Sequence, residues 1–181
     1  MRIITGTARG KRLITVEGSD LVRPTPEKVK EAIFSSIQFD IEGRRILDLF
    51  AGCGQLGIEA LSRGAESAVF VDSSDVSVGT VKKNLLGTDF EEKARVIRSD
   101  YSAYLARCNE KFDIAFLDPP YHANLLEKAL EDVCEYMSDY GIVICEHPSD
   151  IKLGNTVKDF SLYREYKFGK ILVSVYKKGG Q

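Results

Sequence analysis

The feature that most constrains the fold of this chain is a short apolar segment that leads into closely spaced glycines and then into a helix. Residues 46–50 have the composition of a buried strand, and residues 56–63 have helical spacing. Gly52, Gly54 and Gly57 occupy the junction, where glycine lets a ligand approach the backbone at a helix N-terminus. This strand, turn and helix are typical of doubly wound α/β proteins.

The remaining sequence continues the alternation of strands and helices. Strands are expected near residues 46–50, 68–72, 94–98, 113–118, 141–146, 157–166 and 170–177, and helices near 56–63, 75–86, 100–108 and 123–137. The last two strands are too close for a helix between them, which predicts an antiparallel hairpin turning at residues 168–170. The expected fold is α/β, Rossmann-like, with a mostly parallel seven-stranded sheet that ends in this hairpin.

A small appendage is expected in front of this sheet. Residues 3–6 and 13–16 predict a β-hairpin. Thr25 is a candidate cap for a following helix with Pro26 at its first position. The apolar stripe of that helix is formed by Val29, Ala32, Ile33 and Ile37.

Three acidic residues stand at the carboxyl ends of successive expected strands. Asp48 precedes the first glycine by four residues, Asp72 ends the second strand, and Asp100 follows the third. Ligands of open α/β sheets bind along that edge, so Asp72 is a candidate for binding ribose hydroxyls, and Asp100 with Tyr101 for binding adenine. Each acid also has a structural alternative: Asp48 as a capping or salt-bridged residue, and the other two as helix caps.

The glycine pattern alone leaves the ligand open. Gly52, Gly54 and Gly57 satisfy G-x-G-x-x-G, and Asp72 lies near the offset of about twenty residues expected for a nicotinamide dinucleotide. Asp48 favours a different ligand, because a carboxylate ahead of the first glycine repels a pyrophosphate. The same carboxylate suits the cationic amino-acid end of S-adenosylmethionine.

The tetrapeptide Asp118-Pro119-Pro120-Tyr121 indicates the chemistry. The exocyclic amine of a nucleobase is a poor nucleophile because its lone pair is delocalised into the ring. The Asp118 carboxylate and the Pro119 carbonyl could each accept one N–H, which favours the pyramidal nitrogen that attacks a methyl donor. The two prolines hold the carbonyl rigidly, and Tyr121 can stack on an extruded base. An ordinary strand-ending turn is the structural alternative.

Charge is distributed unevenly along the chain. Residues 1–30 hold seven basic and three acidic side chains, a balance of +4, whereas the whole chain carries −2 and the remainder therefore −6. A short basic segment joined to an acidic body indicates local contact with a polyanion. Solvated surface charge is the alternative.

Several segments together resemble one protein family. They are Met1-Arg2-Ile3-Ile4, Arg9-Gly10-Lys11-Arg12-Leu13, the run from Arg23-Pro24-Thr25 to Phe34, Asp48-Leu49-Phe50-Ala51-Gly52, Leu61-Ser62-Arg63-Gly64-Ala65 and Phe116-Leu117-Asp118-Pro119-Pro120-Tyr121. Over nearly its whole length the chain resembles the class I S-adenosylmethionine-dependent methyltransferases, and more narrowly the RsmD family of small-subunit ribosomal RNA guanine-N2 methyltransferases. DNA adenine methyltransferases share the Asp-Pro-Pro-Tyr element, so the Arg-Pro-Thr segment and the N-terminal extension are the specific marks.

The resemblance implies a role for each region. Residues 1–40 would form an RNA-binding extension, and residues 41–181 the methyltransferase domain. The substrate would be a guanine of 16S ribosomal RNA within the small subunit. The residues implied for S-adenosylmethionine are Asp48, Phe50, Gly52, Gly54, Gly57, Asp72, Asp100 and Tyr101. Those implied for the base are Asp118, Pro119, Pro120 and Tyr121, and those for the RNA are Arg2, Arg9, Lys11, Arg12, Arg23 and Thr25.

The chain departs from the family pattern at five positions. Cys53 and Gln55 stand where a hydroxyl or small residue is common, Asp72 where Glu is usual, and Lys28 and Lys30 where Arg is usual. A shorter acid and an ammonium in place of guanidinium could weaken cofactor or phosphate contacts without changing the chemistry.

Composition narrows the protein class. With 181 residues, 44% of them hydrophobic, the chain can bury one substantial core. Four widely spaced cysteines suggest neither a zinc site nor a disulfide framework, so we expect a cytoplasmic protein. No apolar segment approaches the length of a signal peptide or membrane span. We expect a monomer without a metal ion, with His122 in a loop and His147 in a structural role.

Three other functions stay open from the sequence. One is a nicotinamide-dependent oxidoreductase, which the glycine pattern alone would also fit. A DNA adenine-N6 methyltransferase would share the Asp-Pro-Pro-Tyr element, although the chain has no room for a separate target-recognition domain. A noncatalytic RNA-binding assembly factor could retain the fold, although an intact Asp-Pro-Pro-Tyr element argues against loss of the active site.

Overall fold

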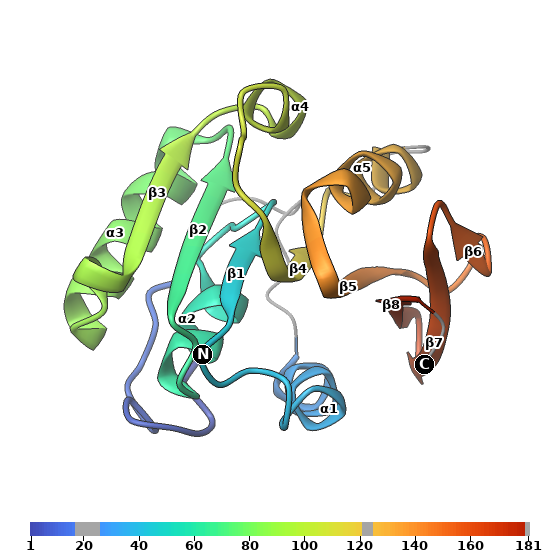
Figure 1. Cartoon of the computed structure of the whole chain (residues 1–181). Coiled ribbons are helices and arrows are strands. Elements are labelled where there is room, and N and C mark those ends of the chain that lie inside the picture. The colour runs from blue at the N-terminus through green and yellow to red at the C-terminus, as the bar shows by residue number, and fades with distance from the viewer. Residues whose placement is uncertain (17–25, 121–124, 180–181) are drawn as a thin grey trace.

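The structure is a computed structural model that describes residues 1–16, 26–120 and 125–179. A single sheet of eight strands forms its centre, in the order β3-β2-β1-β4-β5-β8-β7-β6 (Figure 1). The strands are β1 (Arg45–Asp48), β2 (Ser67–Asp72), β3 (Ala94–Arg98), β4 (Phe112–Leu117), β5 (Met137–Pro148), β6 (Thr156–Val157), β7 (Phe160–Phe168) and β8 (Ile171–Lys178). The helices are α1 (Glu27–Ser36), α2 (Gln55–Ser62), α3 (Asp75–Thr88), α4 (Tyr101–Leu105) and α5 (Leu125–Val133), with 3₁₀ turns at Glu91–Lys93 and Cys134–Tyr136.

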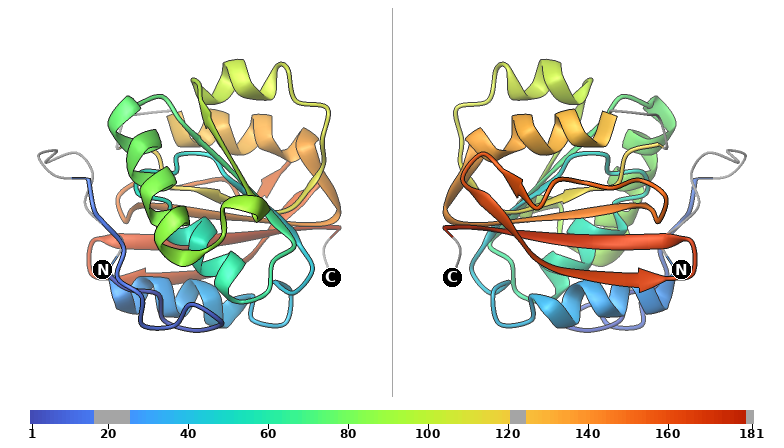
Figure 2. Two further views of the ribbon diagram at one scale, coloured as in Figure 1. Left: turned by 90° about the vertical axis from the view of Figure 1, so that its left-hand side faces the viewer. Right: turned by 90° about the vertical axis from the view of Figure 1, so that its right-hand side faces the viewer.

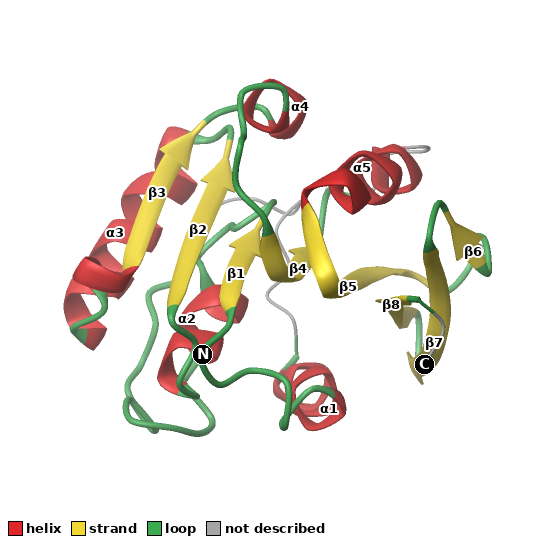
Figure 3. Ribbon diagram, in the orientation of Figure 1, coloured by secondary structure: helices red, strands yellow, loops and turns green. Residues whose placement is uncertain are grey.

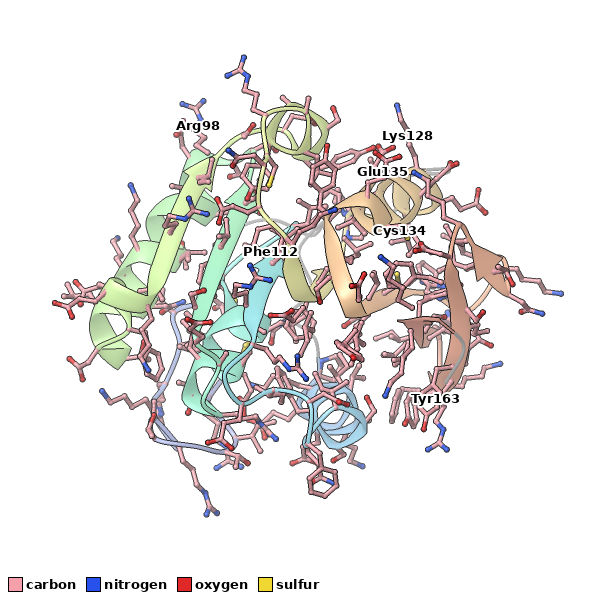
Figure 4. All side chains as sticks on the ribbon, in the orientation of Figure 1. Arg98, Phe112, Lys128, Cys134, Glu135 and Tyr163 are labelled. Carbon is pink, nitrogen blue, oxygen red and sulfur yellow. The ribbon has the colours of Figure 1, made fainter. Side chains whose placement is uncertain are left out.

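The first five strands are parallel, and the last three are antiparallel. β1 pairs with β2 on one side and β4 on the other, and β4 pairs with β5. β8 then runs antiparallel to both β5 and β7, so that the long β7–β8 hairpin closes one end of the sheet (Figure 2). β3 and β7 accordingly carry Arg98 and Tyr163 on opposite sides of the molecule (Figure 4). The expected α/β fold with a C-terminal antiparallel hairpin is confirmed.

The sheet has eight strands where seven were expected. The additional strand, β6, is a two-residue strand that pairs with the start of β7 through Val157 and Phe160. Lys158 has a left-handed φ of 51°, so the chain turns there and the single strand expected over 157–166 is divided. β5 also begins at Met137, earlier than expected, because Met137 pairs with Phe112 before an irregularity in the ladder.

Apolar side chains bury both faces of the sheet. One cluster joins α1, α2 and α3 to the sheet, and within it the Phe34 and Phe116 rings lie 5.7 Å apart. The other cluster joins α4 and α5 to the opposite face. The apolar side of α5 is buried there as expected, through Leu126, Leu130 and Val133. Helices on both faces explain why the central strands are apolar throughout.

The N-terminal segment differs from the expected hairpin. An antiparallel hairpin does form, but its register differs from the expected one: a bridge joins Arg2 to Arg12, and Ile3 exchanges backbone hydrogen bonds with Gly10 and Lys11. The expected pairing of residues 3–6 with 13–16 was therefore wrong in its residues. The chain turns away at Gly6, whose φ is +89° and whose backbone faces α2 so closely that a Cβ would lie 1.8 Å from the Ser62 carbonyl oxygen. Pro26 is also the N-cap of α1, not its first helical residue, and the expected cap Thr25 lies outside the described residues.

A buried ion pair anchors this segment to the body of the protein. The Lys30 ammonium lies 3.1 Å from the Glu59 carboxylate, with both side chains fully buried. Glu59 also accepts hydrogen bonds from the backbone N–H groups of Ile4 and Thr5, at 2.9 and 3.0 Å. Lys30 donates to the Arg2 carbonyl at 2.7 Å. Residues 4 and 5 therefore bond to a helix side chain in place of a partner strand, and Lys30 is not placed to contact phosphate.

Candidate cofactor and substrate site

The acids singled out in the sequence meet at the carboxyl edge of the central strands. Figure 3 shows these strands in yellow, with β1 between β2 and β4. Asp48 ends β1, and its backbone pairs with Phe70 on β2 and Phe116 on β4. Asp72 ends β2 two residues after Phe70, and Asp118 directly follows β4. Parallel neighbours end at one edge, so the structure brings these three residues together as expected.

The glycine-rich turn between β1 and α2 depends on left-handed backbone. Gly52 and Gly54 have φ values of 55° and 79°, and Gly54 is the N-cap of α2. Gly57 is needed for packing, because a Cβ there would lie 2.3 Å from the Phe70 ring. Glycine therefore allows both the tight turn and the close approach of α2 to the sheet.

Asp48 is a buried carboxylate at the foot of this turn. Its Oδ2 accepts a hydrogen bond from the Gly57 N–H at 3.0 Å, so the capping alternative is confirmed in part. Burial raises the pKa of Asp48 to about 7, and the charge of Asp72 adds to this while the Gly57 bond opposes it. Within the described residues no lysine or arginine forms an ion pair with Asp48, Asp72 or Asp118. A cationic ligand would stabilise the ionised form of such a carboxylate.

Asp72 connects the glycine-rich turn to the end of β2. Its Oδ2 accepts from the Gly52 N–H at 2.9 Å, and its Oδ1 from the Ser74 N–H at 2.8 Å. The helix-cap alternative was wrong, because Ser74 is the residue that caps α3, by accepting from Ser77. Each carboxylate oxygen keeps a lone pair with which it could bind a ribose hydroxyl.

Asp100 and Tyr101 have structural contacts of their own. Asp100 caps α4, accepting three hydrogen bonds at Oδ1 from Ser102 and Ala103, so this alternative is confirmed. These bonds lower the pKa of Asp100, the Ser102 hydroxyl contributing most. Tyr101 is buried, with its ring 5.4 Å from that of Phe50 and its hydroxyl 3.4 Å from Asp132. Oδ2 of Asp100 and the edge of the Phe50–Tyr101 pair stay candidates for adenine.

The expected catalytic residues follow β4. Asp118 is half-buried, Pro119 is buried and Pro120 is exposed. Burial raises the pKa of Asp118 well above its usual value, and the charges of Glu146 and Asp48 raise it further. A raised pKa makes the carboxylate a stronger hydrogen-bond acceptor and base. Tyr121 and His122 lie outside the described residues.

Glu146 is a candidate that sequence reasoning missed. It is buried in β5, and the pairing of Leu117 with Cys145 places it level with Asp118 on the neighbouring strand. An acid inside the apolar run 142–146 was the available signal. Its significance depends on the register of β4 against β5, which the sequence does not disclose.

Two of the residues expected to contact RNA, Arg9 and Lys11, lie away from this edge. Thr7 bonds to Ser62 at the end of α2, and Lys11 forms an ion pair of 2.8 Å with Asp89 at the end of α3. These helices start at the carboxyl edge of the sheet and return to its amino edge. The loop that carries Arg9 and Lys11 therefore lies at the opposite edge from Asp118.

The other residues of this set have ordinary surface positions where they are described. Arg2 pairs with Glu27 at 3.3 Å, and Arg9 and Arg12 are exposed. Arg23 and Thr25 lie outside the described residues. None of these placements tests whether the side chains contact RNA.

The second histidine has the structural role that was expected. His147 is buried in β5, with Nδ1 3.0 Å from the Pro148 carbonyl and Nε2 2.8 Å from the Ser174 hydroxyl. Burial lowers its pKa. In the part of the chain that the structure covers, no group of three His, Cys, Asp or Glu side chains is placed to hold a metal ion. None of the described helices has the length and apolar character of a membrane span.

The chain is similar to known proteins over its full length. YlbH of Bacillus subtilis strain 168 is 41% identical, covering 99% of this chain and 100% of its own. The Haemophilus influenzae protein named "Ribosomal RNA small subunit methyltransferase D" is 35% identical, covering 98% of this chain and 93% of its own. The solved structure of yhhF from Escherichia coli is 32% identical and superposes with a TM-score of 0.88, covering 100% of this chain and 99% of that one.

A family model agrees with these relatives. The model described as Conserved hypothetical protein 95 matches residues 1–177. With full-length relatives at 35 and 41% identity, this match shows that the chain belongs to the Conserved hypothetical protein 95 family, which is the RsmD family of methyltransferases.

Proposed function

We propose that this protein transfers a methyl group from S-adenosylmethionine to the exocyclic N2 of a guanine in 16S ribosomal RNA. The observation that carries the proposal is the position of Asp118 and Pro119, one strand away from the buried Asp48. A reaction centre for an amine and a site for a cationic cofactor thus share one edge of the sheet. The names of the relatives support ribosomal RNA of the small subunit as the substrate.

The residues of the carboxyl edge fit this cofactor. Asp48 would accept the ammonium of its amino-acid end, Asp72 the ribose hydroxyls, and Asp100 the adenine amino group. The turn at Gly52 and Gly54 would let the ligand approach the backbone. When bound, S-adenosylmethionine supplies an electrophilic methyl group on a sulfonium.

The protein's own contribution is orientation and proton acceptance. The Asp118 carboxylate and the Pro119 carbonyl accept the two N–H groups of the target amine and aim its lone pair at the methyl group. Positive charge that develops on nitrogen is stabilised by Asp118, whose own charge is held close to those of Asp48 and Glu146. Asp118 or water then takes the proton that the methylated amine loses.

Guanine N2 is the finer part of the proposal. An Asp-Pro-Pro-Tyr site accepts any exocyclic amine, so the choice of guanine rests on the family and on the N-terminal extension. A base in an RNA loop is also easier to unstack than one in a duplex, which suits a small enzyme. We propose a monomer that acts in the cytoplasm on the assembled small subunit, without a metal ion.

Mass spectrometry of nucleosides tests the product. Unmodified small subunits incubated with the protein and S-adenosylmethionine should gain N2-methylguanosine at one position. N6-methyladenosine formed in DNA would favour the adenine alternative. RNA binding without any new methylated nucleoside would favour a noncatalytic assembly factor. Calorimetry with S-adenosylhomocysteine against NAD separates all of these from an oxidoreductase.

A further inference from the structure

The β7–β8 hairpin is a second basic region of the chain. Residues 160–178 hold five basic side chains and one acidic side chain, a balance of +4 that equals that of the first thirty residues. Two of the five are already paired: Lys177 lies 3.6 Å from Asp40, and Lys178 lies 3.3 Å from Asp159. Within the described residues, Lys167 and Lys170 form no ion pair.

The turn of this hairpin lies at the same sheet edge as Asp118. Pro148, at the carboxyl end of β5, pairs with Ile171 immediately after the turn. Ser149 donates a backbone hydrogen bond of 2.9 Å to the Lys170 carbonyl, which holds the turn against the chain that leaves β5. The turn can be followed in Figure 2 as the end of the hairpin away from the C-terminus.

The pairing of β4, β5 and β8 gives the distance between the β7–β8 turn and Asp118. Glu146 lies level with Asp118 on the next strand, and Glu146 pairs with Val173 on β8. Two strand spacings, about 10 Å, therefore separate Asp118 from β8. Lys170 precedes Val173 by three residues and lies in the turn just before β8 begins. A lysine at this position is close enough to bind a phosphate that flanks a base placed at Asp118.

The turn is also open to a partner. Lys167, Gly169 and Lys170 are exposed, and a Cβ at Gly169 would meet no atom within 4 Å. Lys152, from the segment after β5, is exposed as well, and Asp150 is the exposed acid beside it. By contrast, Arg9 and Lys11 lie at the opposite edge, so they do not supply positive charge next to the target base.

We propose that the β7–β8 turn is an RNA-contacting surface, in which Lys167 and Lys170 bind backbone phosphates of the strand that flanks the target nucleotide. The inference rests on the proposed function. Ammonium groups suit this role because they bind phosphate as point charges and do not need a fixed geometry. The surface would position the substrate and take no part in methyl transfer itself.

The test is a double variant of the full chain, Lys167→Ala with Lys170→Ala. Its affinity for unmodified small-subunit RNA should fall at least tenfold, and the slope of log affinity against log salt should become shallower by about 1.4, two phosphate contacts on a single strand. KM for the RNA should rise while kcat and the affinity for S-adenosylhomocysteine stay unchanged. Lys167→Arg with Lys170→Arg should restore binding.

A matched control removes two charges from the same hairpin at its other end, Lys177→Ala with Lys178→Ala. This control should keep the wild-type salt slope. If the turn variant kept the wild-type slope and KM while the wild type methylated the RNA, the surface would be wrong and the proposed function would stand. If the wild type neither bound nor methylated ribosomal RNA, both proposals would fall together.

Discussion

Asp48 is the residue whose environment says most about the ligand. A carboxylate that is buried beside two other acids is costly to ionise, and its pKa of about 7 reflects that cost. The pKa of Asp48 in the folded protein lies above the ordinary value of 3.8, so protonation of Asp48 favours the folded state. Its contribution to the free energy of unfolding is therefore fully present below about pH 3.8. That contribution is lost as pH rises through 7. A cation bound at this carboxylate would offset the cost.

The affinity for S-adenosylmethionine should therefore depend on pH. Binding favours ionised Asp48, so affinity should rise between about pH 5.5 and 8 and level off above, with a limiting slope of about tenfold per pH unit for one proton. Asp48→Asn should bind more weakly and lose this dependence. Calorimetric titrations across the range measure both effects. Equal affinity of the wild type at pH 5.5 and 8 would show that Asp48 does not face the cation.

At the scale of elements, two buried contacts join the N-terminal segment to the helices behind the site. One is the Lys30–Glu59 pair between α1 and α2. The other is Asn84 on α3, which donates to the Ile14 carbonyl at 2.9 Å and to the Cys53 carbonyl at 2.8 Å. Asn84 also accepts from the Ile14 N–H at 2.8 Å. The second contact reaches the glycine-rich turn itself.

Removing the charge of Glu59 should release the N-terminal segment. Glu59→Gln leaves the buried Lys30 ammonium without its counter-charge, which costs about 3–5 kcal/mol. We expect the free energy of unfolding to fall by about that amount in urea titrations. Limited trypsin digestion should also cut faster at Arg9 and Arg12. The exposed Glu66→Gln is the control and should change stability by less than about 0.5 kcal/mol. Equal trypsin rates for both variants would contradict the anchoring role.

Asn84→Ala should remove the hydrogen bonds that join α3 to Ile14 and to the glycine-rich turn at Cys53. The change leaves the Cys53 carbonyl and the Ile14 backbone groups without a partner, which costs about 1–3 kcal/mol. The turn is less fixed as a result, so S-adenosylhomocysteine should bind about tenfold more weakly, about 1.4 kcal/mol. Lys83→Ala, an exposed change on the same helix, is the control. Wild-type affinity in Asn84→Ala, measured by calorimetry, would mean that the turn holds its shape without this bond.

At the scale of the whole molecule, the half that contains the proposed cofactor site was predictable because its signals are local. A strand, three glycines and an acid at the strand's end specify their own geometry, and Asp48, Asp72 and Asp118 meet as expected. The register of the N-terminal hairpin was not predictable, because Glu59, a residue far along the chain, satisfies the backbone at Ile4 and Thr5. Glu146 and the β7–β8 turn required the register of the sheet.

Substitutions of basic side chains at the two edges of the sheet should therefore affect the affinities for long and short RNAs differently. Arg9 and Lys11 replaced together by alanine should weaken binding to the assembled subunit, which can reach both edges. Binding to a short target hairpin should change by less than about twofold, because such an RNA ends near the carboxyl edge. Filter-binding titrations with both RNAs compare the two. Equal losses on both would place these residues beside the target base.

Methyl transfer by Asp118→Ala tests the proposed reaction centre most directly. Labelled S-adenosylmethionine is incubated with unmodified small subunits, and cofactor affinity is measured on the same preparations. The wild type should transfer one methyl group per subunit and the variant none, while the affinity of the variant for S-adenosylmethionine stays within about tenfold of the wild type. Asp72→Ala should show the reverse, with weaker cofactor binding and transfer restored at high cofactor concentration. Normal turnover by Asp118→Ala would contradict the assignment of the reaction centre.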